Sequence, residues 1–185
     1  KHGFKKLFQE KLLAKPETEK DGWAGTDFAT FVEGMDYLYG NGKDIDAAVK
    51  LFQQLEKKKV AVASTMIAIC YSDKDWKKAN EKKAVKYLEK AVETGDALAC
   101  YELGKRYKEG NGVEANKTKA IDLMEKADNL GNAKAMAELG DMYYSGKLVG
   151  KDVTKAIQYY FKGFTNGYLS ANGAKILSDS FAKGI

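Results

Sequence analysis

The sequence predicts an all-α fold, a right-handed α/α superhelix (solenoid) of about four helix-turn-helix repeats with an extra helix at each end. Three observations predict it: an internal period of 36 residues, an apolar helical face in each copy, and N-cap residues that keep the same period. Of the 185 residues, 44% are hydrophobic and 31% are charged, as in an ordinary folded protein. The single proline, Pro16, leaves the rest of the chain free to form uninterrupted helices.

The period is clearest around the turns that begin each repeat. The segment from Gly95 to Ala99 (GDALA) recurs 36 residues later from Gly131 (GNAKA), and again, more loosely, from Gly167 (GYLSA). The residues Leu103, Gly104, Tyr107 and Gly110 recur at the same spacing as Leu139, Gly140, Tyr143 and Gly146. So many matched positions at one period predict repeats of one supersecondary unit that stack on their neighbours.

The second helix of each unit follows from an alanine that keeps the period. These anchor alanines are Ala48, Ala84, Ala120 and Ala156. Apolar residues follow each anchor three, four and seven positions later, with glycine at the last of these positions in the fourth copy, and this spacing gives a helix one buried face. An N-cap residue precedes each anchor by four positions, and these residues are Asp44, Asn80, Asn116 and Asp152.

These patterns give the domain boundaries. We predict a capping helix and linker over 1–24, repeats over 25–58, 59–94, 95–130 and 131–166, and a capping helix over 167–185. The N-terminal helix is amphipathic over 1–15. The second repeat is degenerate, since Lys59 replaces the turn glycine and Ala68 replaces the helix glycine. The inner loop of the first repeat is two residues shorter than the others.

The motif LGxxYxxG, a loop, and then Asp or Asn followed by xxKA occurs at 103–120 and 139–156. It resembles the Sel1-like repeat, a relative of the tetratricopeptide repeats, over nearly all of the chain after residue 24. The resemblance implies adaptor work through protein–protein contacts. Some bacterial members carry paired cysteines in each repeat, and this chain does not.

Chemistry-bearing residues are sparse in the sequence. The only histidine is His2, and Cys70 and Cys100 show no metal-ligand spacing, so we expect no catalytic residues, metal or cofactor. Ser180 and Lys183 form a lone Ser-x-x-Lys match at the end of the stack, which a hydrolase alternative would need. The net charge of +5 comes from lysines interleaved with acidic residues, so we expect no nucleic-acid partner. No apolar run approaches the roughly 20 residues that a spanning helix needs, so we expect no membrane span.

The predicted binding surface lies on the first helices, opposite the repeat core. This stripe is apolar in the first two repeats and mostly polar in the last two. The candidate partner-binding residues are Phe28, Phe31, Val32, Met35, Tyr39, Val62, Met66, Ile69, Tyr101, Glu102 and Lys105. An exposed apolar stripe indicates either that the helix at 1–15 covers it or that a partner binds there, and both can hold if the two compete.

The sequence therefore predicts a non-catalytic scaffold that binds another protein or peptide on a concave first-helix surface, as a monomer or weak dimer. Two alternatives stay open: an immunity or inhibitor protein that neutralises a bacterial toxin enzyme, and a hydrolase such as a β-lactamase-like member of the family. The chain starts at Lys1, which fits a mature form after signal removal or a trimmed chain. We expect a periplasmic or secreted location over a cytoplasmic one.

Overall fold

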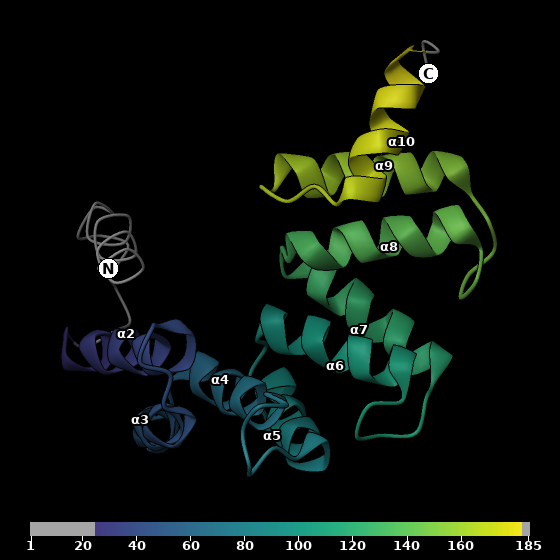
Figure 1. Ribbon diagram of the computed structural model, residues 1–185. Coiled ribbons are helices and arrows are strands. Elements are labelled where there is room, and N and C mark those ends of the chain that lie inside the picture. The colour runs from purple at the N-terminus through teal and green to yellow at the C-terminus, as the bar shows by residue number, and fades with distance from the viewer. Residues whose placement is uncertain (1–24, 183–185) are drawn as a thin grey trace. The chain divides into compact units, whose positions relative to one another are not determined.

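The computed structural model describes residues 25–182, and this range forms nine helices without a strand (Figure 1). The helices divide into two compact units that meet in sequence between Asn80 and Glu81. None of the described helices is long and apolar enough to span a bilayer. The predicted helix over 1–15 lies outside the described residues.

The N-terminal unit contains three of these helices. They are α2 (Gly25–Tyr39), α3 (Ile45–Lys57) and α4 (Ala61–Tyr71). Helix α3 packs against both of the others, and its Phe52 and Leu55 are completely buried. The loop between α2 and α3 covers 40–44, two residues fewer than the corresponding loops at 110–116 and 146–152. The shorter inner loop of the first repeat is therefore confirmed.

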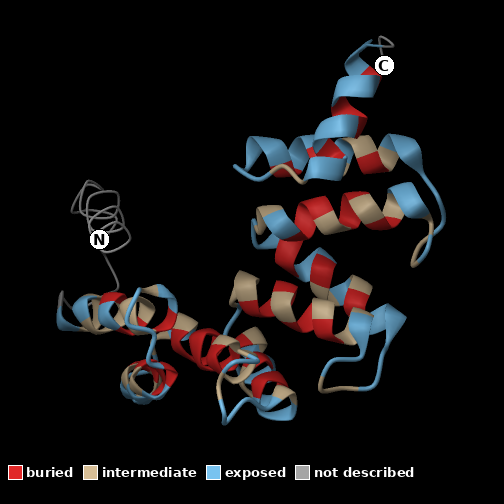
Figure 2. Ribbon diagram, viewed as in Figure 1, coloured by how far each residue is buried: buried red, intermediate tan, exposed pale blue. Residues whose placement is uncertain are grey.

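The C-terminal unit contains six helices. They are α5 (Glu81–Glu93), α6 (Ala97–Glu109), α7 (Lys117–Asn129), α8 (Ala133–Ser145), α9 (Val153–Thr165) and α10 (Ala171–Ala182). Each helix packs on the next, and α10 also contacts α8, so every helix of this unit carries buried residues (Figure 2). Figure 1 shows α8 and α9 lying side by side, with α10 crossing α9.

The repeat pattern correctly predicted the core and the helix starts. All four anchor alanines are fully buried, whichever unit they belong to. The carboxylates of Asp44 and Asp152 and the amide oxygen of Asn116 each accept a hydrogen bond from the backbone N–H three residues later, at 2.8–3.0 Å. Because such a bond satisfies a free donor of the first turn, each cap fixes where its helix begins.

Close approach of paired helices depends on a glycine of the first helix that faces a large side chain of the second. A Cβ atom added to Gly34 would lie 2.7 Å from the Phe52 ring, and one added to Gly140 would lie 2.7 Å from the Tyr160 ring. At Gly104 the corresponding neighbour is the end of the Met124 side chain, 3.1 Å away. The glycines of the repeat motif therefore make room for the bulkiest core residues.

The turns between repeats require a left-handed backbone. Gly95, Gly131 and Gly167 have φ angles of 81°, 84° and 87°. Lys59 occupies the equivalent position, 36 residues before Gly95, and it is the one non-glycine residue of the described range with positive φ, at 61°. Because a Cβ atom disfavours this conformation, Lys59 holds backbone strain that glycine would relieve.

We therefore expect Lys59→Gly to stabilise the protein by about 0.5–1 kcal/mol. This is the net of two effects, because glycine relieves the backbone strain of the folded state but also raises the conformational entropy of the unfolded chain. Urea unfolding followed by circular dichroism measures this change. The control is Lys57→Gly, inside the last turn of α3, which should instead destabilise by about 0.5–1 kcal/mol. Equal losses at both positions would contradict the strain at Lys59.

Candidate protein-interaction surfaces

The first part of the predicted binding surface lies on α2. Tyr39 is the most accessible of its residues, with 52% of its surface exposed, and Phe28 and Met35 are half-buried. Val32 is buried, and Phe31 packs on the core residue Phe52 with ring centroids 6.0 Å apart. The α2 stripe thus presents Phe28, Phe31, Met35 and Tyr39 in part to solvent, and of these Phe31 also packs on the core residue Phe52.

The second part lies on α4. Met66 is buried with 5% of its surface exposed, whereas Val62 and Ile69 are half-buried. Helix α4 is apolar nearly all round, so its sequence gives little indication of which face is covered. Only Val62 and Ile69 of the predicted α4 residues present partial surface.

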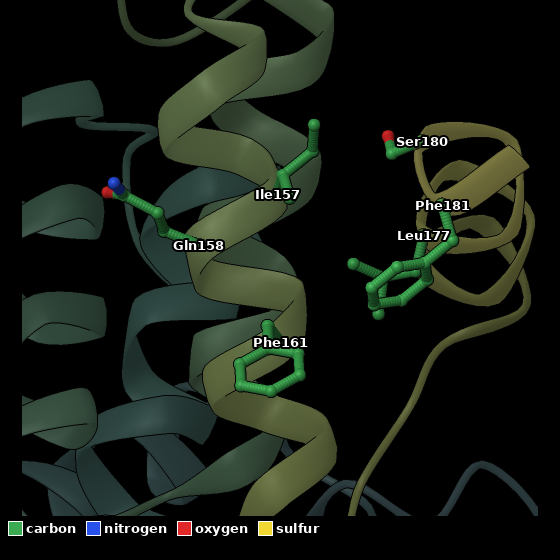
Figure 3. Close-up of a pocket in the computed structure, with 6 residues that line it drawn as sticks. All are labelled: Ile157, Gln158, Phe161, Leu177, Ser180 and Phe181. Atoms are coloured by element: carbon green, nitrogen blue, oxygen red, sulfur yellow. The ribbon is translucent and has the colours of Figure 1, made fainter. Parts of the chain in front are cut away.

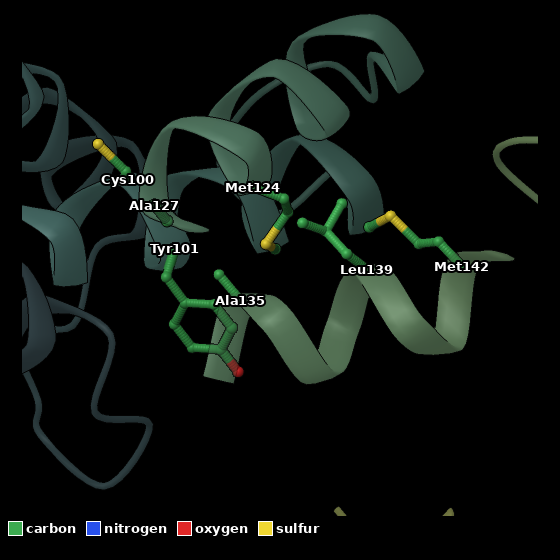
Figure 4. Close-up of a cluster of buried hydrophobic side chains, with 7 residues drawn as sticks. All are labelled: Cys100, Tyr101, Met124, Ala127, Ala135, Leu139 and Met142. Carbon is green, nitrogen blue, oxygen red and sulfur yellow. The ribbon is translucent and has the colours of Figure 1, made fainter. Parts of the chain in front are cut away.

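The third part lies on α6 in the C-terminal unit. Tyr101 is buried and belongs to a cluster that includes Met124, Ala135 and Leu139; Figure 4 shows its ring beside Ala135. The Lys105 ammonium lies 5.3 Å from the centre of that ring and 3.7 Å from a Glu102 carboxylate oxygen. Burial, and then the nearby carboxylates of Glu138 and Glu102, raise the pKa of Tyr101, so its hydroxyl stays protonated.

The Glu102 carboxylate also pairs with a second cation, the Arg106 guanidinium. Glu102 accepts from Arg106 at 3.2 Å, and the Arg106 guanidinium also lies 3.4 Å from Glu81. Arg106 is buried, so this pairing fixes α6 to the start of α5. The three predicted residues of α6 thus lie together, with Tyr101 buried and with Glu102 and Lys105 forming a charged, paired part of the stripe that is mostly polar in this repeat.

The repeat geometry has a match among known families. The profile of the Sel1 repeat family matches residues 34–57, 61–96, 97–132 and 133–168, which is well over half of the chain. The chain belongs to the Sel1 repeat family. No curated protein matches its sequence.

Solved structures share the fold of this Sel1 repeat chain. A Sel1 repeat protein from Oxalobacter formigenes is 25% identical, with a TM-score of 0.73 over 95% of this chain and 69% of that one. A protective antigen of uropathogenic Escherichia coli with an SLR fold is 22% identical, with a TM-score of 0.72 over 98% of this chain and 37% of that one.

A third structure, cysteine-rich protein B of Helicobacter pylori, is 24% identical, with a TM-score of 0.56 over 75% of this chain and 98% of that one. The predicted fold class, an all-α helical-repeat superhelix, is confirmed by these matches and by the family profile. Sel1 repeat proteins are generally protein-interaction scaffolds.

The cysteine thiols and the Ser180 hydroxyl of this Sel1 repeat chain are buried. Cys70 and Cys100 are fully buried free thiols, and burial raises the pKa of Cys70 to about 12 and also raises the pKa of Cys100. Ser180 donates its hydroxyl hydrogen bond to the Ile176 carbonyl at 2.8 Å, within its own helix. Lys183 and His2 lie outside the described residues, which contain no cluster of three or more metal-ligating side chains.

Sequence reasoning missed a second apolar surface on α9 and α10. Its most exposed residues are Phe161, Phe164 and Phe181. A comparison of α9 with α7 at the 36-residue period would have found the first two, because the equivalent positions hold Glu125 and Asp128.

Proposed function

We propose that this Sel1 repeat chain is a non-catalytic scaffold that binds a partner protein or peptide on its first helices, chiefly through the accessible apolar residues of α2. The observation that carries the proposal is the difference between two equivalent helices. With Gly34 matched to Gly140, the α2 residues Phe28, Met35 and Tyr39 correspond to Lys134, Asp141 and Ser145 of α8. The repeat therefore does not require apolar residues at these positions.

The partial exposure of these α2 side chains supports recognition by an apolar partner surface. These side chains lie at i, i+7 and i+11, a spacing that follows one stripe of a helix, and an amphipathic helix or a strand buries such a stripe well. Tyr39 offers an aromatic ring with a polar end, a residue type enriched at interfaces. A helix over 1–15, which the sequence predicts, would compete with the partner for the same stripe.

The test begins with capture of a protein from the host lysate by the full chain and by a variant lacking residues 1–20. The captured partner is then purified, and its affinity is measured by calorimetry. We expect the double variant Met35→Asp/Tyr39→Asp to weaken binding at least about tenfold, the effect of losing a well-buried contact. Phe31 and Met66 are poor choices because both pack inward, so aspartate there would damage the fold.

Leu130→Asp is the matched control, since Leu130 is 46% exposed, directly follows the last residue of α7, and is not one of the predicted partner-binding residues. Thermal unfolding of each variant checks that the fold is kept. Equal affinity of the double variant and the control would contradict the proposed surface. Tighter binding by the truncated chain would show that residues 1–20 compete, and a captured toxin enzyme would narrow the function to an immunity protein.

A further inference from the structure

An apolar surface covers the outer sides of α9 and α10, and we call it the C-terminal apolar surface. It consists of Val153, Ile157, Phe161 and Phe164 on α9 and Phe181 on α10, and the buried Leu177 of α10 lines a cavity within it. Phe161, Phe164 and Phe181 are 49%, 55% and 67% exposed. The α9 members lie at i, i+4, i+8 and i+11, a spacing that places them on one face of the helix.

The repeat architecture does not account for this face. The equivalent positions of α7, 36 residues earlier, hold Lys117, Ile121, Glu125 and Asp128. Lys117 and Glu125 are exposed there, whereas the Asp128 carboxylate is buried and pairs with Lys162 of α9 at 2.5 Å. Aromatic rings have thus replaced charged side chains on α9, both at an outward position and at the position that contacts the following repeat.

The same surface contains a cavity. It has a volume of about 230 Å³ and is lined by Ile157, Gln158, Phe161, Leu177, Ser180 and Phe181. In Figure 3 the apolar side chains of α9 and α10 face one another, and the Gln158 amide points away from them. The Ser180 hydroxyl is bonded within its own helix, so the cavity offers almost no polar recognition. A cavity of roughly 150 Å³ already accommodates benzene, so this one can take a phenyl ring.

This face has both a protruding aromatic ring and, next to it, a cavity large enough for such a ring. Phe181 is the most exposed large apolar residue of the described range, and it forms one edge of the cavity. A two-fold interface must be self-complementary, and this arrangement meets that condition because each copy offers both a group that inserts and a site that receives it. We propose that the C-terminal apolar surface is a homodimer interface in which the Phe181 ring of each copy enters the cavity of the other.

The apolar centre of this proposed interface is small. Three phenylalanines of about 200 Å² each, roughly half exposed, give about 300 Å² of apolar area per copy. A standard interface buries about 800 Å² per partner around such an apolar centre. We therefore expect a weak dimer, and the test is designed for dissociation constants of about 1–100 μM.

Sedimentation velocity over a concentration series of the full chain tests the proposal. We expect reversible dimerisation of the wild type, and at least a tenfold rise in dissociation constant for Phe181→Asp and for Phe161→Asp. Both side chains are about half exposed or more, so the variants should fold, which circular dichroism checks. Leu130→Asp and Met35→Asp/Tyr39→Asp should dimerise as the wild type does.

Two outcomes would overturn the inference. One is a wild type that stays monomeric at concentrations well above the expected dissociation constant, which would leave the surface for a different protein. The other is a dimer that survives Phe181→Asp but is lost in the α2 double variant, which would place self-association on α2. The first outcome leaves partner binding by α2 untouched. The second would make α2 a self-association surface, and calorimetry with the captured partner then tests separately whether α2 also binds another protein.

Discussion

Tyr160→Ala is expected to lower the free energy of unfolding by about 3–5 kcal/mol, the range for removing a fully buried aromatic side chain. Tyr160 has no exposed surface and lies at the centre of the contacts between α8, α9 and α10. A Cβ atom added to Gly140 or to Gly173 would come within 2.7 Å of its ring. Two glycines thus enclose the ring closely, and the neighbouring backbones cannot easily collapse into the space that alanine would leave.

A conservative variant separates ring packing from the hydroxyl. The Tyr160 hydroxyl donates to Asp141 at 2.7 Å, and the Asn172 amide donates to the same carboxylate at 2.5 Å and to the hydroxyl at 3.1 Å. Burial, and then the Asp141 carboxylate, raise the pKa of Tyr160, so the phenol remains the donor at neutral pH. Tyr160→Phe removes one of the two donors to Asp141 and should cost about 1–2 kcal/mol.

Urea unfolding of the two variants, followed by far-ultraviolet circular dichroism, measures both losses. A loss in Tyr160→Ala no greater than that in Tyr160→Phe would show that the ring itself stabilises little. Such a result would contradict the close packing of the two glycines against it.

The period explains why most of the fold was predictable. A 36-residue repeat places every anchor alanine and every second-helix cap by a single rule, and burial of Ala48 and capping by Asp152 follow it in the structure. The rule also extends to caps that the sequence analysis did not identify. Asp96 and Asn132 accept backbone hydrogen bonds at the starts of α6 and α8, again 36 residues apart.

The start of helix α10 departs from the 36-residue period, so the period does not predict the contacts of this helix. Helix α8 begins two residues after Gly131, whereas α10 begins four residues after Gly167, where the Ser170 hydroxyl accepts from the Gly173 N–H at 3.0 Å. This shift brings Asn172 and Gly173 against Tyr160. The repeat alone would instead have matched Ile176 to Gly140.

The sequence could not show which residues of the predicted binding stripe are accessible, for a different reason. Helix α2 has apolar residues on its packed side, such as Leu38, and also on the predicted stripe. Helical periodicity therefore cannot separate a core residue from its accessible neighbour. Phe31 shows the difficulty, because it lies on the predicted stripe but packs on Phe52. Only the three-dimensional contact identifies Met35 and Tyr39 as better probes of partner binding.

Phe52→Ala is expected to cost about 3–5 kcal/mol in the N-terminal unit, because the ring is fully buried between α2 and α3. Collapse of Phe31 into the vacated space would place the loss toward the lower end of that range. Urea unfolding measures it, with Lys50→Ala on the exposed side of α3 as the control, for which the change should stay within about 0.5 kcal/mol.

Gly34→Ala then shows whether the loss comes from the contact between the two helices. In the wild type its Cβ atom would meet the Phe52 ring at 2.7 Å, so alanine should destabilise by about 1–3 kcal/mol despite its better helix propensity. In the Phe52→Ala background the same substitution fills part of the cavity and should stabilise by about 1 kcal/mol. The change of sign amounts to a coupling energy of at least about 2 kcal/mol between the two positions. Additive effects would instead mean that the cost of Gly34→Ala does not come from contact with the Phe52 ring.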